Sequence, residues 1–417
     1  MDKKNWDWQT PEKQIPIKEW QDRYNWMEDP RVSPDGEHIA AIVNLDEACF
    51  GVCDNGQTWD ETFEKAWSLK YAPDGTLAAL VSRDEEWTVC LDGTLWDTWF
   101  DFIWNLQISS DGTYLGVAVQ KDMAYGMAVN DNIWENMYNH ITGAILSDQG
   151  NSAAIVQVEQ LGQADIEGFS QGVFSAAVEG LAYPSRFMNM WDLTFDRRGI
   201  QVAYAIRKNR TDYSLVNGSE AWDRNFQAVW KPEFFNQDSA VVAPVKLDGK
   251  WHLFKDGHAF WDQAFGQLWK LVIHDASNQI AAIVSDAFGK WTLCVNGKTW
   301  PFHCNNMIWD PFFSGNGKKL IALCKHNNTW DVVVNGQPWQ LQADKLWRPA
   351  VSANNDIIAT QMEKNGRYFL IVNGKIFHQS FNMIFEPQIS PENDKILLKS
   401  IQDGIYKRQI LEINTII

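Results

Sequence analysis

The stretch TWDETFEKAWSLKYAPDG, from Thr58 to Gly75, decides the fold because its pattern recurs along the chain. Its aromatic residues stand four apart at Trp59, Phe63 and Trp67, and a Pro-Asp-Gly turn follows. The next copy is LWDTWFDFIWNLQISSDG, which ends at Gly112. Further copies lie at Trp222, Phe226 and Trp230 and at Trp261, Phe265 and Trp269, with weaker ones at Tyr183, Phe187 and Trp191 and at Phe377, Phe381 and Phe385. Self-similarity at a fixed period predicts a repeat protein.

Each repeat reads as four short strands, of which the second is almost continuously apolar and the third ends at a tight turn. These turns are mostly Asn-Gly or Asp-Gly pairs, which favour type I′ hairpins because both central residues need a positive φ. Their second positions are 37 to 40 residues apart, except for one interval of 49. The excess lies in residues 159–172, which we interpret as an insertion in the fourth repeat.

The predicted fold class is all-β, a β-propeller of about ten four-stranded repeats of 37–40 residues. The last repeat has three strands before the C-terminus, and EWQDRYNW near the start of the chain resembles a fourth strand. An N-terminal strand would therefore close the propeller and leave no open edge. A single ring is favoured over two rings. The predicted domains are an N-terminal tail, residues 1–19, and a propeller, residues 20–417, that contains the insertion 159–172.

The repeat accounts for 20 of the 23 tryptophans and leaves Trp6, Trp8 and Trp99 outside it. Large rings that pack between neighbouring sheets supply broad apolar contact, so we interpret the repeated tryptophans as structural. A tryptophan-lined sugar-binding surface is the alternative interpretation.

Composition limits the function. The formal charge of −17 argues against nucleic acid or anionic lipid as a direct ligand. The start of the sequence has no apolar run of signal-peptide length, and no stretch is long and apolar enough for a membrane span. We therefore expect a soluble protein that is not exported by the general secretory route. The six cysteines form no C-x-x-C pair, and we expect them to be small buried residues of the repeat.

The motifs that could support chemistry are weak. Residues 168–172, GFSQG, fit the G-x-S-x-G nucleophile elbow, but they lie in the insertion of an all-β repeat, where no helical layer follows. The eight histidines show no metal-ligand spacing, and neither G-x-G-x-x-G nor a Walker A loop is present. We expect no catalytic residues, no cofactor, no metal site and no enzyme activity.

The repeats resemble WD-repeat-like (WD40-like) propeller units, and the clearest marks are SPDG at Ser33 to Gly36 and APDG at Ala72 to Gly75. In tryptophan content, acidity, length and lack of cofactor motifs the whole chain also resembles the TmcD-like family. These are the tryptophan-rich subunits of the transmembrane electron-transfer complex of sulfate-reducing bacteria. The resemblance implies a cofactor-free subunit, cytoplasmic and peripherally associated with the inner membrane. It also implies a membrane cytochrome b-type subunit and an iron–sulfur subunit as partners.

We therefore expect a non-catalytic scaffold of a membrane-bound electron-transfer complex. Two places are predicted to contact partners. Trp6 and Trp8 lie in the tail and have no repeat core to fill, and aromatic residues are enriched at interface hot spots. Gly168 and Phe169 lie in the insertion, which is the one irregularity of the repeat. The alternatives are a free-standing propeller that binds carbohydrate or peptide, and a hydrolase-associated propeller that uses Ser170.

Overall fold

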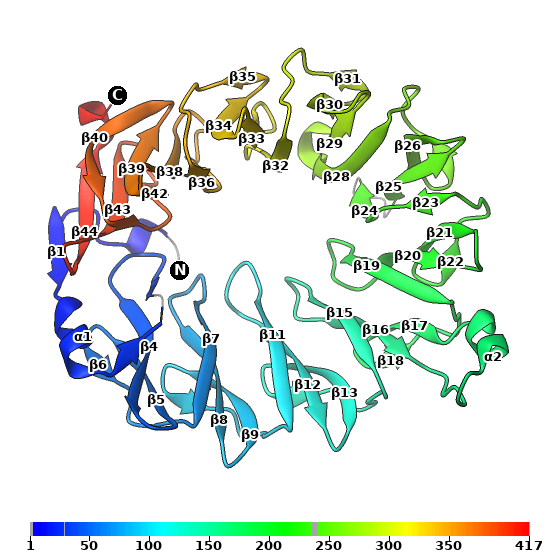
Figure 1. Ribbon diagram of the computed structural model, residues 1–417, viewed down its shortest axis with the longest axis horizontal. Coiled ribbons are helices and arrows are strands. Elements are labelled where there is room, and N and C mark those ends of the chain that lie inside the picture. Colours follow the sequence, from blue (N-terminus) through cyan, green and yellow to red (C-terminus); the bar gives the residue numbers. More distant parts are fainter. Residues whose placement is uncertain (1–2, 29, 236–239, 417) are drawn as a thin grey trace. The chain divides into compact units, whose positions relative to one another are not determined.

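The computed structural model describes residues 3–28, 30–235 and 240–416. These residues form ten antiparallel sheets, and Figure 1 shows that the strands of each sheet follow one another along the chain, except that β1 joins the sheet of β44. The chain divides into two compact units, Met1–Trp99 with Asn306–Ile417 (unit 1) and Phe100–Asn305 (unit 2). Each unit contains five of the ten sheets, which we call blades and number in chain order.

The second blade shows how the repeat folds. It contains β7 (Lys65–Tyr71), β8 (Leu77–Arg83), β9 (Glu86–Leu91) and β10 (Thr94–Leu95), each paired with the next. The first six residues of β8 are all buried, and Leu77, Ala79 and Val81 on one of its faces pack in one core cluster with Ala40 and Ile42 of the first blade. This explains the continuous apolar run at this position, since a strand buried on both faces has no side that needs polar residues.

The other blades of unit 1 repeat this order. The first contains β2 (Trp26–Met27), β3 (Arg31–Val32), β4 (Ile39–Asp46), β5 (Cys49–Asp54) and β6 (Gln57–Thr58). The eighth contains β32 (Met307–Phe313), β33 (Leu320–His326), β34 (Thr329–Val334) and β35 (Gln337–Pro338). The ninth contains β36 (Lys345–Leu346), β37 (Ala350–Val351), β38 (Ile358–Lys364), β39 (Arg367–Val372) and β40 (Lys375–Phe381).

Unit 2 holds blades three to seven. The third and fourth contain β11 (Phe102–Ile108), β12 (Leu115–Lys121), β13 (Ala124–Val129), β14 (Asn132–Ile133), β15 (Ile141–Leu146), β16 (Ser152–Gln157), β17 (Phe174–Val178) and β18 (Leu181–Ala182). The fifth contains β19 (Asn189–Phe195), β20 (Val202–Arg207), β21 (Tyr213–Asn217) and β22 (Glu220–Ala221). The sixth and seventh contain β23 (Ala228–Val229), β24 (Glu233–Phe235), β25 (Ala240–Leu247), β26 (Lys250–Lys255), β27 (His258–Ala259), β28 (Gln267–His274), β29 (Gln279–Ser285), β30 (Trp291–Val295) and β31 (Lys298–Thr299).

The first strand of every blade is irregular. In six blades it has a bulge, and the residue after its aromatic position has a positive φ, as in Ser68 (56°) and Asn105 (57°). In the other four blades the strand is divided in two, as in β2 and β3. A bulge bends a strand and increases its local twist, which re-aims the neighbouring side chains.

The tight turns between third and fourth strands have the predicted chemistry. Asn55, Asp92 and Asn373 all have a positive φ, as a type I′ turn requires. The side-chain oxygen of each also accepts a hydrogen bond from the backbone N–H at the start of the second strand, for example from Ile358 to Asn373 at 2.8 Å. This second role explains why Asn or Asp stands at the first turn position.

The tenth blade is completed by the start of the chain. It contains β41 (Met383–Ile384), β42 (Gln388–Ile389), β43 (Lys395–Gln402) and β44 (Ile405–Glu412). Its fourth strand is β1 (Glu12–Ile15), which pairs antiparallel with β44. The described residues therefore form a ten-bladed, single-ring β-propeller of four-stranded sheets, and the predicted fold class and closure are confirmed.

Two details of that prediction are corrected. The closing strand is Glu12–Ile15 rather than EWQDRYNW, whose residues 19–23 belong to the helix α1 (Lys18–Arg23). Trp20 nevertheless packs beside the hairpin residue Gly56, as Trp59 packs beside Gly93. The boundary at residue 20 also moves, because residues 12–15 of the predicted tail belong to a blade and residues 3–5 form a 3₁₀ turn.

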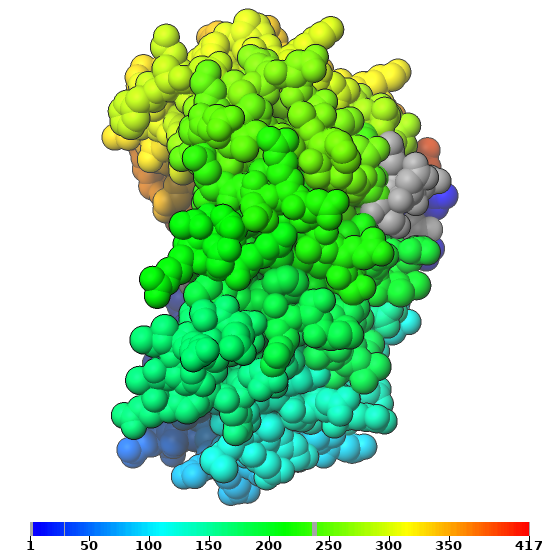
Figure 2. Space-filling view, turned by 90° about the vertical axis from the view of Figure 1, so that its right-hand side faces the viewer, coloured from blue at the N-terminus to red at the C-terminus, as the bar shows by residue number. Residues whose placement is uncertain are grey.

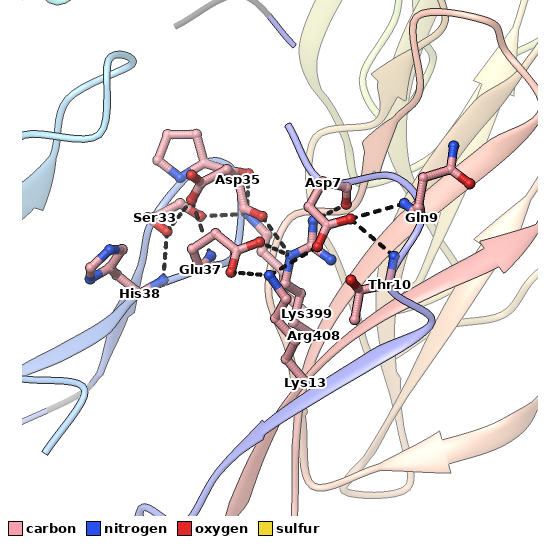
Figure 3. Close-up of polar contacts among 12 residues, drawn as sticks. Asp7, Gln9, Thr10, Lys13, Ser33, Asp35, Glu37, His38, Lys399 and Arg408 are labelled. Carbon is pink, nitrogen blue, oxygen red and sulfur yellow. Dashed lines mark hydrogen bonds and ion pairs between the residues drawn. The ribbon is translucent and has the colours of Figure 1, made fainter. Parts of the chain in front are cut away.

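A buried polar cluster holds the tenth blade to the first and to the chain start (Figure 3). The Arg408 guanidinium, which is 1% exposed, donates to the backbone carbonyls of Asp35 and Asp7. Lys399 lies 3.3 Å from the carbonyls of Ser33 and Pro34, and burial lowers its pKa to about 8. At the edge of the cluster, Lys13 pairs with Asp7 at 3.0 Å and with Glu37 at 2.7 Å.

The insertion 159–172 lies between β16 and β17 of the fourth blade and contains the helix α2 (Ile166–Gln171). The Asp165 side chain accepts a hydrogen bond from the backbone N–H of Gly168 at 2.8 Å, which caps the helix. None of the six helical residues is buried. Figure 1 shows α2 projecting from this blade.

Candidate functional site

Trp6 and Trp8, predicted as a contact site, are both buried. Their rings are 6.0 Å apart in a stacked arrangement, and they pack against Leu397 and Ile410 of the tenth blade. The Trp8 indole N–H donates to the carbonyl of Lys3 at 2.8 Å. The premise that these tryptophans have no core to fill is therefore wrong. They supply an apolar cover that the strands of the tenth blade do not provide for themselves.

Gly168 and Phe169, the other predicted contact residues, lie in the exposed helix α2. Phe169 is 36% exposed and Ile166, one turn before it, is 69% exposed. Ser170 donates from its hydroxyl to the carbonyl of Glu167 at 2.8 Å, within the same helix. Ser170 is thus a helical residue, whereas a nucleophile elbow places its serine on a turn between a strand and a helix.

The strand directions define two edges of each blade. At one edge the first and third strands begin and the second strand ends; we call it the aromatic edge. At the other edge lie the turns between first and second strands and the hairpins between third and fourth strands; we call it the hairpin edge. In the second blade, for example, Lys65 pairs with Ser82 at the aromatic edge and Tyr71 pairs with Leu77 at the hairpin edge.

Aromatic side chains of the first and third strands pair at the aromatic edge. In unit 1 the ring centroids are 5.5 Å apart for Trp26 and Phe50, 6.0 Å for Trp67 and Trp87, 5.6 Å for Trp347 and Tyr368, and 6.4 Å for Phe385 and Tyr406. In unit 2 they are 6.3 Å apart for Trp104 and Tyr125, 6.0 Å for Trp191 and Tyr213, 5.4 Å for Trp230 and Trp251, and 6.4 Å for Trp269 and Trp291. Such pairs fix the orientation of both rings.

The first-strand member of several pairs remains open to solvent. The exposed fraction is 46% for Trp26, 38% for Trp67 and 45% for Trp230, and Trp309 at the same position of the eighth blade is 53% exposed. The third-strand partner Trp251, by contrast, is 4% exposed. The tryptophans of the first strands are therefore both packing residues and surface residues, which the repeat pattern alone does not distinguish.

The aromatic edge also holds most of the other exposed apolar side chains of the described residues. Nine of their thirteen exposed large hydrophobic residues belong to this edge: Trp26, Trp67, Phe102, Met123, Ile166, Phe169, Trp230, Phe288 and Trp309. Met123 (83% exposed) and Phe288 (107%) lie in turns between second and third strands, and α2 connects the same two strands of its blade. Phe169 of the sequence prediction thus belongs to a larger set of residues.

Sequence analysis missed Met123 and Phe288, although a signal existed. Both replace polar residues that other repeats have in this turn, such as Asp84 with Glu85 and Asn327 with Asn328. Apolar residues in an exposed turn gain nothing from burial within the fold, so these two are candidates for contact with a partner. Figure 2 shows one face of unit 2, whose blades run from cyan through green to yellow-green.

The residues described contain no group of three or more His, Cys, Asp or Glu that could hold a metal ion. Cys53, Cys90, Cys294, Cys304 and Cys324 are buried, as predicted, while Cys49 is partly exposed. Burial raises the pKa of Cys90 and of Cys294 to about 12. These thiols are therefore packing residues and not poised nucleophiles.

The fold defines the class of protein as a β-propeller. No protein-family model matches the chain, and no curated protein matches it either. Among solved structures it is similar to the crystal structure of a eukaryotic initiation factor, with 12% identity and a TM-score of 0.43 over 79% of this chain and 95% of the other. It is also similar to the Dos1 propeller, with 11% identity and a TM-score of 0.38 over 92% of this chain and 91% of the other. In the part of the chain that is described, no helix has the length and apolar character of a membrane span.

Proposed function

We propose that this protein is a non-catalytic scaffold that docks on partner proteins through the aromatic edge of its blades. The supporting observation is the concentration of exposed apolar side chains there, nine of thirteen among the described residues. Single exposed apolar residues are normal on a protein surface, but in each unit most of them stand at the same edge of the blades, which favours this edge for docking.

The residue types favour a protein as the partner. Trp, Phe and Met are enriched in the cores of protein interfaces, where they fill pockets of the partner. Trp26 and Trp230 are held by ring contacts with Phe50 and Trp251, so little side-chain freedom is lost when a partner covers them. Met123 and Phe288 on turn tips can reach a partner first.

The partners in this proposal are a membrane cytochrome b-type subunit and an iron–sulfur subunit of an electron-transfer complex. The support for this choice is the resemblance to TmcD-like subunits in tryptophan content, acidity and length. The protein would then be cytoplasmic, would contribute no cofactor, and would reach the inner membrane only through these subunits.

Two double variants test the docking surface in the full chain. Met123→Ser with Phe288→Ser removes apolar side chains from the aromatic edge. Leu181→Ser with Ile200→Ser is the matched control, because these residues are 67% and 60% exposed but lie at the hairpin edge. All four positions are on the surface, so we expect both variants to fold like the wild type.

The measurement is a gentle detergent pull-down of each tagged protein from its native host, with mass spectrometry and a visible absorption spectrum of the eluate. We expect haem- and iron–sulfur-containing subunits with the wild type and the control, and at least tenfold less of them with the aromatic-edge variant. Equal recovery by both variants would contradict docking at this edge. If the wild type and the control recover other proteins, and the aromatic-edge variant loses them, docking at this edge is supported and only the choice of electron-transfer partners is contradicted.

A further inference from the structure

An open pocket of about 340 Å³ lies between the third and fourth blades, at their hairpin edge. Tyr114, Asn132, Trp134 and Glu135 of the third blade line one side, and Ser152 and Glu179 of the fourth blade line the other. All of these residues belong to unit 2. The pocket is on the opposite edge of the blades from the proposed docking surface, so it is a separate site.

The pocket coincides with a local departure from the repeat. Ser152 opens the second strand of its blade, where Leu77, Leu115 and Val241 stand in other blades. Glu179 occupies the hairpin position that is Asn or Asp in most repeats. A serine leaves more space than leucine and adds a hydroxyl group to a position that is otherwise apolar. Departures from an otherwise consistent pattern are expected at functional sites.

The floor of the pocket is a closed hydrogen-bond network. The indole N–H of Trp134 donates to the Ser152 hydroxyl at 2.8 Å, and that hydroxyl donates to Glu179 Oε1 at 2.8 Å. The backbone N–H of Ser152 donates to the same oxygen. Ser152 and Trp134 are 0% and 5% exposed, so the network is fixed by packing as well as by hydrogen bonds.

Tyr114 forms part of the pocket wall because Gly150 gives its ring room. A Cβ atom at Gly150 would lie 2.5 Å from the ring of Tyr114, and Gly150 has a φ of 87°. Any larger residue at this turn would displace the ring. In the second blade the residue equivalent to Tyr114 is Thr76, so this aromatic wall is a feature of the pocket and not of the repeat.

The polar groups left without a partner are almost all acceptors. The Asn132 side-chain N–H₂ donates to the carbonyls of Val129 and Asn130, which leaves its oxygen free. The carboxylate of Glu135 and the second oxygen of Glu179 have no hydrogen bond within the described residues. The lining contains no Lys, Arg or His among the residues described. A ligand that satisfies these groups must be rich in hydrogen-bond donors and positively charged.

We propose that this pocket binds the guanidinium group of an arginine side chain on a partner polypeptide. Guanidinium presents five N–H donors in one plane and accepts none, which matches two carboxylates and an amide oxygen. Its flat face can stack on an aromatic ring such as that of Tyr114. The net charge of −17 attracts a basic segment toward the surface and repels phosphate or carboxylate ligands.

Titration of the ¹⁵N-labelled full chain with two blocked tripeptides tests the proposal. One peptide is glycine–arginine–glycine, and the other has citrulline, which keeps the shape of arginine and lacks its charge. The reporter is the Trp134 indole N–H resonance, which is assigned by its loss in Trp134→Phe. Glu135→Gln removes one carboxylate that makes no contact in the fold, and Glu220→Gln changes an exposed acid of another blade as the control.

We expect the arginine peptide to shift the Trp134 resonance in a saturable way and the citrulline peptide to leave it in place. Glu135→Gln should weaken the affinity about tenfold, since a hydrogen bond to a charged group is lost, and Glu220→Gln should not change it. The proposal is overturned if the resonance does not respond, if citrulline acts like arginine, or if Glu135→Gln binds as tightly as the wild type.

Discussion

The hydroxyl of Tyr406 donates a hydrogen bond of 2.7 Å to the backbone carbonyl of Gly36, although 370 residues separate them in the chain. Gly36 has a φ of 74°, and a Cβ atom there would lie 3.2 Å from the side chains of Arg408 and Lys399. A residue with a Cβ atom would be strained at this φ and would press on both side chains, so glycine favours the close approach of the tenth blade to the first. Closure depends on this buried contact as well as on the strand β1.

Arg408→Met should destabilise the protein by about 3 kcal/mol, because the carbonyls of Asp35 and Asp7 lose their buried donor. The free energy of unfolding from urea titration measures this loss. Lys407→Met is the matched control, since Lys407 is the neighbour of Arg408 on the same strand and is only partly buried. Equal stability of the two variants would contradict a role of Arg408 in closure.

Lys399 should make stability depend on alkaline pH. Burial lowers its folded pKa to about 8 from 10.5, so between these values the unfolded state binds more protons than the folded state. Stability due to this residue therefore rises with pH through this window, by about 3 kcal/mol in total. Lys399→Met lacks this titrating group. The unfolding free energy of the variant minus that of the wild type should therefore fall by up to about 3 kcal/mol from pH 8 to pH 10.5.

The same urea titrations at several pH values test this expectation. Other titrating groups are common to both proteins and largely cancel in the difference. A difference that does not change with pH would show that Lys399 keeps an ordinary pKa in the fold.

Asn373→Ala should destabilise the ninth blade by about 2 kcal/mol. The change removes the acceptor for the backbone N–H of Ile358, a residue that is only 3% exposed. It also places alanine at a φ of 47°, which a residue with a Cβ atom tolerates poorly. Asn373→Asp keeps the acceptor oxygen and should recover most of the loss, as Asp92 serves naturally in the second blade. Thermal unfolding of the three proteins checks the order, and an Asp variant as unstable as the Ala variant would contradict it.

The buried cysteines should resist alkylation in the folded protein. Burial raises the pKa of Cys90 and Cys294 to about 12, so little thiolate exists at pH 8. We expect mass spectrometry after iodoacetamide treatment to show one label at Cys49 in the native protein and six in denaturant. Rapid labelling of Cys90 or Cys294 without denaturant would indicate that their blades open.

The sequence by itself determined the four-stranded fold of each blade. The Asn-Gly turns predicted the hairpins because only a few residue types tolerate a positive φ, and the apolar second strands predicted sheets that are covered on both faces. The count of ten and the closure by the chain start followed from the spacing of these signals. Trp20 was correctly matched to Trp59, although the strand that pairs with β44 proved to be Glu12–Ile15.

Only the tertiary structure decided which aromatic side chains are buried. Trp26 stands at a repeat position and Trp6 stands outside the repeat, yet Trp6 is 8% exposed and Trp26 46%. Burial depends on which distant segment covers a side chain: Leu397 and Ile410 pack against the Trp6 and Trp8 cluster, whereas Trp26 contacts Phe50 with part of its ring uncovered. The pocket at Ser152 is hidden from sequence for the same reason, since its two walls come from different repeats and meet only when the blades pack.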